Sequence, residues 1–337
     1  MRKLTLIALC VILAVTVLSG VVGAQASRVV IYSALDAPVT SEVLKAFERA
    51  TGLRTEALTL AAAGTLATRI TAERARPQAD IFLGGSADFH APLARQGLLE
   101  AYRSPALAGS GIAREFYDPN GFWYGWYIGA LALMYNRQQL PSRGGRAPAT
   151  WDDLLNPAFR GSVVLPSPIT TGGGFIFVAA QIFRFDRNED RAFAYLKQLA
   201  ANATFTPTAP GGITLVSRGE ATVGMNWGHD IRSMAVNQGF PVDIVFPPDT
   251  ATEIGAVSII RGGPNPEGAR RFVDFMLSRV PQDINGKFGL RYPTRPDVPS
   301  PLGMPPLSSL KFVRYDRQWA IDNMARLREK WQREIGR

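Results

Sequence analysis

The feature that most constrains the fold is a unit of strand, small-residue loop and helix that occurs three times in succession. Arg28–Ser33 is a short β-branched strand, and the apolar spacing of Pro38–Ala50 predicts a helix after it. Thr55–Leu60 and Ala79–Leu83 predict two more strands, each followed by a small-residue loop and a helix. This alternation favours an α/β fold with a parallel sheet, whose loops gather at the carboxyl ends of the strands. Ligands of such folds bind at that edge.

The N-terminus predicts export of the chain. Arg2 and Lys3 precede an apolar run over residues 4–22, and Ala24-Gln25-Ala26 has the small-residue spacing that signal peptidase cleaves. We therefore expect residues 1–26 to be a signal peptide and the mature protein to be periplasmic or secreted. The alternative is an uncleaved membrane anchor, because the apolar run is nearly long enough to span a bilayer.

Composition argues against several classes of function. The single cysteine, Cys10, lies in the export segment, so the mature chain has no disulfide, thiol chemistry or cysteine metal site. The formal charge of +9 loses Arg2 and Lys3 and becomes +7, and the remaining basic residues are scattered. Scattered charge on an exported protein argues against nucleic acid as a partner and favours a small anionic ligand steered to a positive cleft. About 310 residues remain, enough for two ordinary domains.

The three loops after the first strands predict an anion site. Ser33 and Ala34 follow the first strand, Thr65 lies in the loop after the second, and Ser86 ends the loop after the third. Backbone N–H groups and hydroxyls that converge at helix N-termini are suited to hold a phosphate or carboxylate. For Ser33, the alternative is an ordinary turn or capping residue.

A further glycine-rich loop, Ser167–Gly174, precedes the helical run Phe175–Phe183. It places Thr170, Thr171 and Gly172 beside the exposed N–H groups of a helix start, which again suits an anion. No Gly-Lys-Ser/Thr follows, so the loop is not a Walker nucleotide-binding motif. The alternative is that the glycines open the helix for steric reasons alone.

Histidine is scarce, with only His90 and His229 in the chain, and His229 stands directly before Asp230 at the end of an apolar strand. Trp227 precedes this pair, and Glu253 begins another strand-like segment. Carboxylates, an imidazole and an indole suit a hydroxyl-rich ligand, because acids accept hydrogen bonds from hydroxyls and an aromatic ring covers C–H faces. The alternative is that the His-Asp pair only caps the helix that follows.

Several stretches occur in an order typical of one family: Val29–Ser33, Asp80–Asp88, Trp151–Pro157 with the strand from Gly161, Ser167–Gly174, Ala269–Ser278 and Arg291–Pro296. Together they resemble the extracellular solute-binding proteins of ABC importers of the ferric-iron or thiamine type. The resemblance covers essentially the whole mature chain, and its specificity lies in the ordered set.

The resemblance implies a type II periplasmic binding protein fold, in which two α/β lobes are joined by a hinge and hold a ligand cleft between them. The first lobe would hold residues 27–130 and 250–285, and the second residues 131–249 and 286–337. It also implies a monomer that closes on a small anionic ligand and presents it to a membrane permease. Such a protein is not an enzyme, and we expect no cofactor and no metal.

The ligand class rests on the residues around Trp227. Ferric-binding members of the family carry adjacent tyrosines where this chain has Asn226 and Trp227, neither of which supplies the anionic oxygen that ferric iron prefers. A hexose-phosphate-binding branch has a His-Asp pair followed by a glutamate, which His229, Asp230 and Glu253 match. The resemblance implies that these three hold sugar hydroxyls. The phosphate would be held by helix N-termini and by hydroxyls of Ser33, Thr65, Ser86, Thr170 and Thr171.

Two alternatives stay open beside this prediction of an importer component for a sugar phosphate or related organophosphate. A ferric-iron protein would use Tyr292 together with the histidine, aspartate and glutamate named above. A secreted hydrolase would use Ser33 or Ser86 with the same histidine. The sequence has no Gly-x-Ser-x-Gly elbow, and an adjacent histidine and aspartate do not by themselves form a triad.

Overall fold

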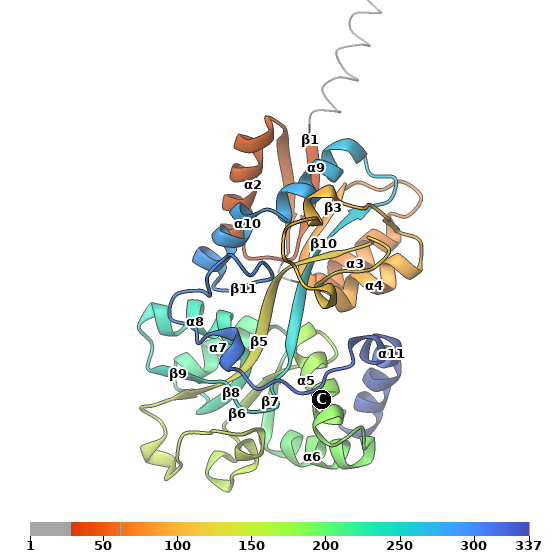
Figure 1. The fold of residues 1–337 in the computed structure, drawn as a ribbon. Coiled ribbons are helices and arrows are strands. Elements are labelled where there is room, and N and C mark those ends of the chain that lie inside the picture. Colours follow the sequence, from red (N-terminus) through yellow and green to blue (C-terminus); the bar gives the residue numbers. More distant parts are fainter. Residues whose placement is uncertain (1–27, 61, 337) are drawn as a thin grey trace, which may run out of the picture.

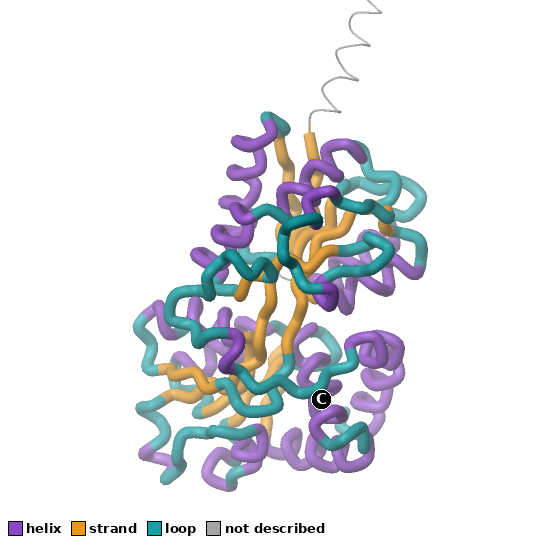
Figure 2. The backbone as a smooth tube through the Cα atoms, viewed as in Figure 1, coloured by secondary structure: helices purple, strands orange, loops and turns teal. Residues whose placement is uncertain are grey.

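A single sheet path runs through the whole molecule in this computed structural model, which describes residues 28–60 and 62–336. The strand order is β2-β1-β3-β10-β5-β8-β6-β7, with β4, β9 and β11 paired beside this path. The strands form two groups, each covered by helices, so the predicted α/β class is confirmed (Figure 1). Figure 2 shows strands that continue from one group into the other. The predicted signal peptide lies outside the described residues.

The first lobe contains the three strand-loop-helix units that the sequence predicts. Its elements are β1 (Arg28–Ser33), α2 (Ala37–Thr51), β2 (Arg54–Thr59), α3 (Ala63–Ala72), β3 (Ile81–Ser86), α4 (Ala87–Arg95), β4 (Leu99–Glu100), α9 (Pro266–Met276) and α10 (Arg279–Ile284). β1 pairs in parallel with β2 on one side and with β3 on the other. The loops that lead into α2, α3 and α4 therefore leave the sheet at one edge.

The second lobe repeats this organisation in the middle of the chain. Its elements are β6 (Val163–Pro166), α5 (Gly172–Arg184), α6 (Glu189–Asn202), β7 (Ala203–Thr206), α7 (Ala209–Ser217), β8 (Val223–Trp227), α8 (Gly228–Met234) and β9 (Val242–Val245). β6 pairs in parallel with β7 and β8, so α5, α7 and α8 also begin at one edge. The two edges face the same interlobe region.

Two long strands, β5 (Tyr124–Asn136) and β10 (Thr252–Ile260), connect the lobes (Figure 1). They pair antiparallel and place Glu253 opposite Gly129. The first half of β5 also pairs with β11 (Tyr292–Pro293), and its second half pairs with β8 and β9. β5 thus pairs with strands of both lobes.

The C-terminal part of the chain touches both lobes. The π-helix Asn285–Gly289 packs against α2 of the first lobe, whereas Ala320, Leu327 and Trp331 of α11 (Arg317–Glu334) belong to the core of the second. The predicted lobe boundary at residue 286 falls inside this π-helix, and the exact boundaries stay a prediction. Short 3-10 helices are Pro105–Leu107, Arg114–Phe116, Pro141–Arg143, Trp151–Leu155, Pro157–Phe159, Val236–Gln238 and Leu307–Ser309.

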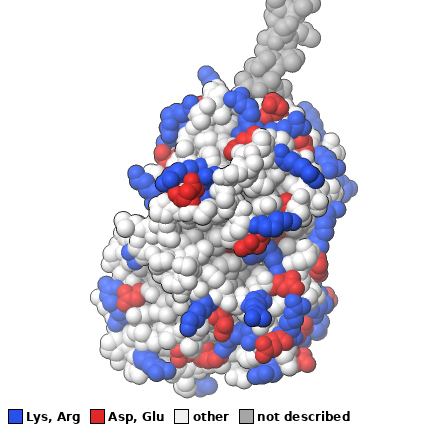
Figure 3. All heavy atoms as spheres, viewed as in Figure 1, with Lys and Arg blue, Asp and Glu red and all other residues white. Residues whose placement is uncertain are grey.

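Charged side chains of both signs are interspersed over the visible face of the molecule (Figure 3). The positive formal charge therefore does not gather into one patch on this face, which agrees with the scattered basic residues of the sequence. None of the helices in the described ranges has the length and apolar character needed to span a bilayer.

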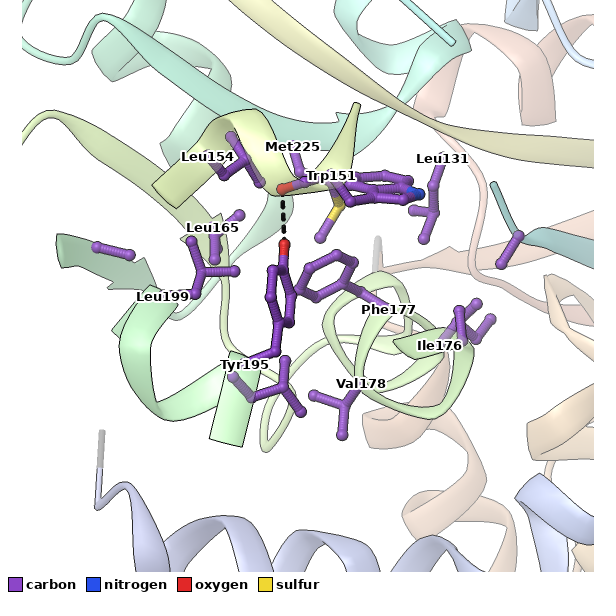
Figure 4. Packing of buried hydrophobic residues seen from close by; sticks show 14 of the residues in the cluster. Leu131, Trp151, Leu154, Leu165, Ile176, Phe177, Val178, Tyr195, Leu199 and Met225 are labelled. Carbon is purple, nitrogen blue, oxygen red and sulfur yellow. Dashed lines mark hydrogen bonds between the residues drawn. The ribbon is translucent and has the colours of Figure 1, made fainter. Parts of the chain in front are cut away.

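The core of the second lobe fixes the position of α5. Residues 173–183 of this helix are all buried, and Phe177 contacts Trp151 with ring centroids 5.2 Å apart. Tyr195 of α6 donates its hydroxyl hydrogen to the backbone oxygen of Trp151 at 2.7 Å (Figure 4). The close packing of these rings and of the buried face of α5 holds the helix in place against the rest of the lobe.

Candidate ligand-binding site

A cavity of about 180 Å³ lies between the lobes. Nine of the eleven residues predicted to bind ligand line it, although they are widely separated in the sequence. These nine are Ala34, Ser86, Thr170, Thr171, Gly172, Trp227, His229, Asp230 and Glu253. The structure therefore brings the predicted anion loops and the His-Asp-Glu set, which lie far apart in the sequence, to one cavity.

The other two predicted residues, Ser33 and Thr65, do not line the cavity. The Ser33 side chain is fully buried, and its hydroxyl lies 2.8 Å from the hydroxyl of Thr40 and accepts the backbone N–H of Leu35. Ser33 thus has the turn role that was the alternative prediction. Thr65 lies one residue beyond Gly64, which does line the cavity, and its side chain is exposed on α3.

Helix N-termini supply most of the hydrogen-bond donors at the cavity. Lining residues lie at the first turns of α3, α4, α5 and α7: Ala62, Ala63, Gly64, Gly85, Ser86, Thr171, Gly172, Gly173, Thr208 and Ala209. The first N–H groups of a helix have no partner within the helix and carry the positive end of its dipole. Four such ends at one cavity form a site for an anion.

Three hydroxyls at these helix starts, those of Ser86, Thr170 and Thr171, have protein partners. Thr171 donates to the backbone oxygen of Ser167 at 2.7 Å and accepts the N–H of Gly174 at 3.0 Å. Ser86 donates to the carboxylate of Asp88, and Thr170 donates to the backbone oxygen of Pro207. These three hydroxyls therefore hold the loops in shape, and the donors at the helix starts that stay available to an anion are backbone amides and the Thr208 hydroxyl.

The second half of the site is the predicted His-Asp-Glu set. His229 Nε2 lies 3.3 Å from Asp230 Oδ1, and the imidazole is almost fully buried. A Cβ atom at Gly129 would lie 2.9 Å from both Glu253 Oε1 and His229 Cε1. Gly129 thus leaves the space in which the imidazole and the Glu253 carboxyl face the cavity.

Arg291 and Asp36 complete this half of the site, and neither was predicted from the sequence to bind ligand. Arg291 donates to Asp36 Oδ2 at 3.0 Å and lies 3.6 Å from Asp230 Oδ1. Its guanidinium also covers the ring of Tyr127, at 5.3 Å from the centroid. No local pattern marks Arg291 among the arginines of the chain, and the one available signal was its place in the Arg291–Pro296 segment.

Burial changes the protonation of these groups. Burial raises the pKa of Glu253 to about 8, although the nearby Arg291 charge opposes the change. Burial also raises the pKa of Asp230, again against the effect of Arg291. The pKa of His229 lies well below its ordinary value because of burial and the Arg291 charge. Near neutral pH the site therefore offers a neutral imidazole and a protonated Glu253, which both donate and accept hydrogen bonds.

Aromatic side chains from both lobes form the walls of the cavity. Trp227 stacks nearly parallel to His229, with ring centroids 6.2 Å apart, and its indole edge lies against Gly173. Phe89 of α4 lies between Gly64 and Gly172, where a Cβ atom would approach its ring to 3.3 and 3.2 Å. Glycine at both positions lets the phenyl ring and the two helix starts approach closely.

The residues that the iron-binding and hydrolase alternatives would use are not arranged as those functions require. Tyr292 is buried, donates its hydroxyl hydrogen to the backbone oxygen of Pro305 and does not line the cavity. Within residues 28–60 and 62–336, no group of three or more His, Cys, Asp or Glu side chains is arranged to hold a metal ion. Ser33 and Ser86 direct their hydroxyls to Thr40 and Asp88, so the Ser-His contact of a hydrolase is not formed.

Two α/β lobes, two crossing strands and a cavity lined from both sides define a two-lobed binding protein. The chain belongs to the bacterial extracellular solute-binding proteins, whose family model matches residues 76–318.

Individual relatives agree with this assignment. The periplasmic binding protein AfuA of Actinobacillus pleuropneumoniae, solved with fructose-6-phosphate bound, is 32% identical, with a TM-score of 0.83 over 92% of this chain and 98% of AfuA. Iron-bound HitA of Pseudomonas aeruginosa is 21% identical, with a TM-score of 0.80 over 92% and 99% of the two chains. The putative 2-aminoethylphosphonate-binding periplasmic protein of Salmonella paratyphi A is 28% identical over 260 residues, which are 75% of this chain and 73% of that protein.

These comparisons confirm the predicted type II periplasmic binding fold and the predicted family. The protein is the solute-binding component of an ABC importer, which binds a small ligand and works with a membrane permease. Its relatives are binding proteins, which fits the prediction that it is not an enzyme.

Proposed function

We propose that the protein captures a sugar phosphate or a related organophosphate between its lobes. The observation that carries this proposal is the meeting of four helix N-termini with the His229, Asp230 and Glu253 set at one cavity. The first group suits a phosphate or phosphonate, and the second suits the hydroxyls of a polyol. A ligand with both features uses the whole site.

The balance of charge supports a phosphate held by backbone amides. Among the described residues that line the cavity, Arg291 is the one cationic side chain, and Asp36 and Asp230 lie beside it. Its charge is therefore largely compensated within the protein. The helix starts, which carry no side-chain charge at Gly172 and Gly173, are left as the attractive surface for an anion.

The protonation of the second half of the site supports a hydroxyl-rich ligand. Sugar hydroxyls both donate and accept hydrogen bonds, and so do a neutral imidazole and a protonated carboxyl. The Trp227 ring adds a flat apolar surface for the C–H face of a sugar. AfuA was solved with a sugar phosphate and the Salmonella relative is named for a phosphonate, and both ligands combine an anionic phosphorus group with a small organic part.

The setting of this function follows from the sequence. We expect cleavage near Ala26 to release the chain into the periplasm, where it works as a monomer and delivers the ligand to its permease.

Isothermal titration of ligand-free protein tests the proposed ligand class. D-Fructose 6-phosphate is expected to release or absorb heat with a single binding site, and 2-aminoethylphosphonate tests the phosphonate variant of the proposal. D-Fructose and inorganic phosphate are each expected to bind much more weakly, because each engages only half of the site. Binding of free sugars alone would refute the phosphate assignment. A tyrosinate charge-transfer colour with ferric citrate would favour the iron alternative.

A further inference from the structure

An ion pair that does not itself line the cavity joins the two lobes beside it. Arg317, the first residue of α11, donates to both carboxylate oxygens of Asp88 on α4, at 3.0 and 3.3 Å. The Asp88 side chain is only 2% exposed and that of Arg317 only 17%. Since α4 belongs to the first lobe and the body of α11 packs in the core of the second, this contact spans the two lobes.

The same carboxylate controls a residue of the cavity wall. Asp88 accepts the hydroxyl hydrogen of Ser86, and its backbone N–H donates to the Ser86 oxygen at 3.3 Å. Ser86 is the N-cap of α4 and lines the cavity. The second terminal nitrogen of Arg317 donates to the backbone oxygen of Thr252, next to Glu253. Arg317 therefore reaches the supports of both halves of the site without lining it.

A residue further along α11 contacts the glycine-rich loop Ser167–Gly174 of the second lobe. Arg328 donates to the backbone oxygen of Pro168 at 3.0 Å, and its guanidinium lies over the ring of Phe175. Pro168 belongs to the loop that carries Thr170, Thr171 and Gly172. One helix thus touches the segments that present the N-termini of both α4 and α5 to the cavity.

We propose that Asp88 and Arg317 are positioning residues that act as an interlobe latch. Their pair holds α4 and its capping Ser86 in the arrangement seen here and favours lobe closure around the solute. A separation of the lobes that parts the two charges would lose the energy of the pair, so the pair would favour the closed form over the open one. The proposal rests on capture of a solute between the lobes and does not depend on the solute being a phosphate.

Four proteins test the latch: the wild type, Arg317→Met, Asp88→Asn and the control Arg95→Met. The control breaks the Arg95–Asp322 pair, which joins the same two helices but whose side chains are 50% and 46% exposed. The Asp88→Asn substitution keeps a side-chain oxygen that accepts from Ser86 while removing the charge. With D-fructose 6-phosphate as probe, we expect Arg317→Met and Asp88→Asn to weaken binding about tenfold, mainly through faster dissociation. We expect the exposed control to change binding by less than about threefold.

A second measurement needs no ligand. Spin labels are attached to two cysteines introduced by Arg49→Cys and Asp190→Cys, one on each lobe, in mature protein that has no other cysteine. We expect the interlobe distance distribution of the solute-free wild type and of Arg95→Met to include a closed component that both latch variants lose. A distribution common to all four proteins overturns the latch. If the wild type ignores fructose 6-phosphate, the ligand proposal fails, but these distances still decide the latch.

Discussion

Glu253 illustrates how burial sets the chemistry of single residues in this cleft. Its side chain lies opposite Gly129 and faces His229, with Arg291 as the compensating charge nearby. The raised pKa means that the folded protein keeps a proton on Glu253 under conditions in which the unfolded chain loses it. This carboxyl therefore works as a hydrogen-bond donor as well as an acceptor.

The proton on Glu253 predicts a pH dependence of stability. Its folded pKa of about 8 exceeds the ordinary value of 4.5, so the stabilisation is complete below the ordinary pKa and is lost as pH rises toward 8. The melting temperature of the ligand-free wild type is expected to fall between about pH 5 and about pH 9, and that of Glu253→Gln to fall less. The difference at high pH should be roughly 2–4 °C for each kcal/mol of relieved charge burial.

Scanning calorimetry across this pH range measures the effect, with Glu267→Gln as the control because Glu267 is 77% exposed. If the melting temperatures of the wild type and of Glu253→Gln change with pH in parallel, Glu253 is not a buried, protonated carboxyl.

At the level of single residues, the polar groups at strand ends were easier to predict from the sequence than the groups that compensate their charge. His229, Asp230 and Glu253 were recognised from the scarcity of histidine and the family resemblance, and the structure places all three at the cavity. Arg291 was not recognised, because its role comes from contacts with Asp36 and Tyr127, which are distant in sequence. Ser33, which was predicted to contact the ligand, does not line the cavity, because its hydroxyl pairs with that of Thr40, a contact that sequence position does not show.

At the scale of elements, the start of α5 depends on its cap. Thr171 accepts the N–H of Gly174 and so holds the first turn in which Gly172 and Gly173 line the cavity. Without the cap this turn frays, and its amides no longer point together at an anion.

Thr171→Ala is therefore expected to lower both stability and ligand affinity. The free energy of unfolding should fall by about 1 kcal/mol, and the affinity for the phosphorylated ligand should fall about fivefold. The matched control is Asn188→Ala, since Asn188 caps α6 through the N–H of Arg191 and does not line the cavity. Urea unfolding and titration of both variants check this. An equal loss of affinity in the control would show that general destabilisation is the cause.

Strand-loop-helix units were the elements most accessible to prediction, because their apolar periods are strong and their loops contain small residues. β1 begins and ends where the sequence predicted, and α2 differs by one residue at each end. Neither α10 nor the π-helix after it shows a clear apolar period in the sequence, so neither helix was predicted.

At the scale of the whole molecule, function depends on contacts between distant parts of the chain. β5 and β10 place Gly129 and Glu253 beside the cavity. The C-terminal helix α11 packs in the second lobe and contacts α4 of the first. Sequence periodicity gives each lobe separately, but the pairing of lobes follows from tertiary packing that no local pattern contains. The resemblance to a family supplied this part of the prediction.

The identity of the solute is the central question, and native mass spectrometry of protein purified from cells without unfolding addresses it most directly. We expect an adduct of one small molecule per chain, and the released molecule should contain a phosphate or phosphonate group on a polyol or other small organic part. A bound ferric ion or an unphosphorylated sugar in its place would refute the proposed ligand class.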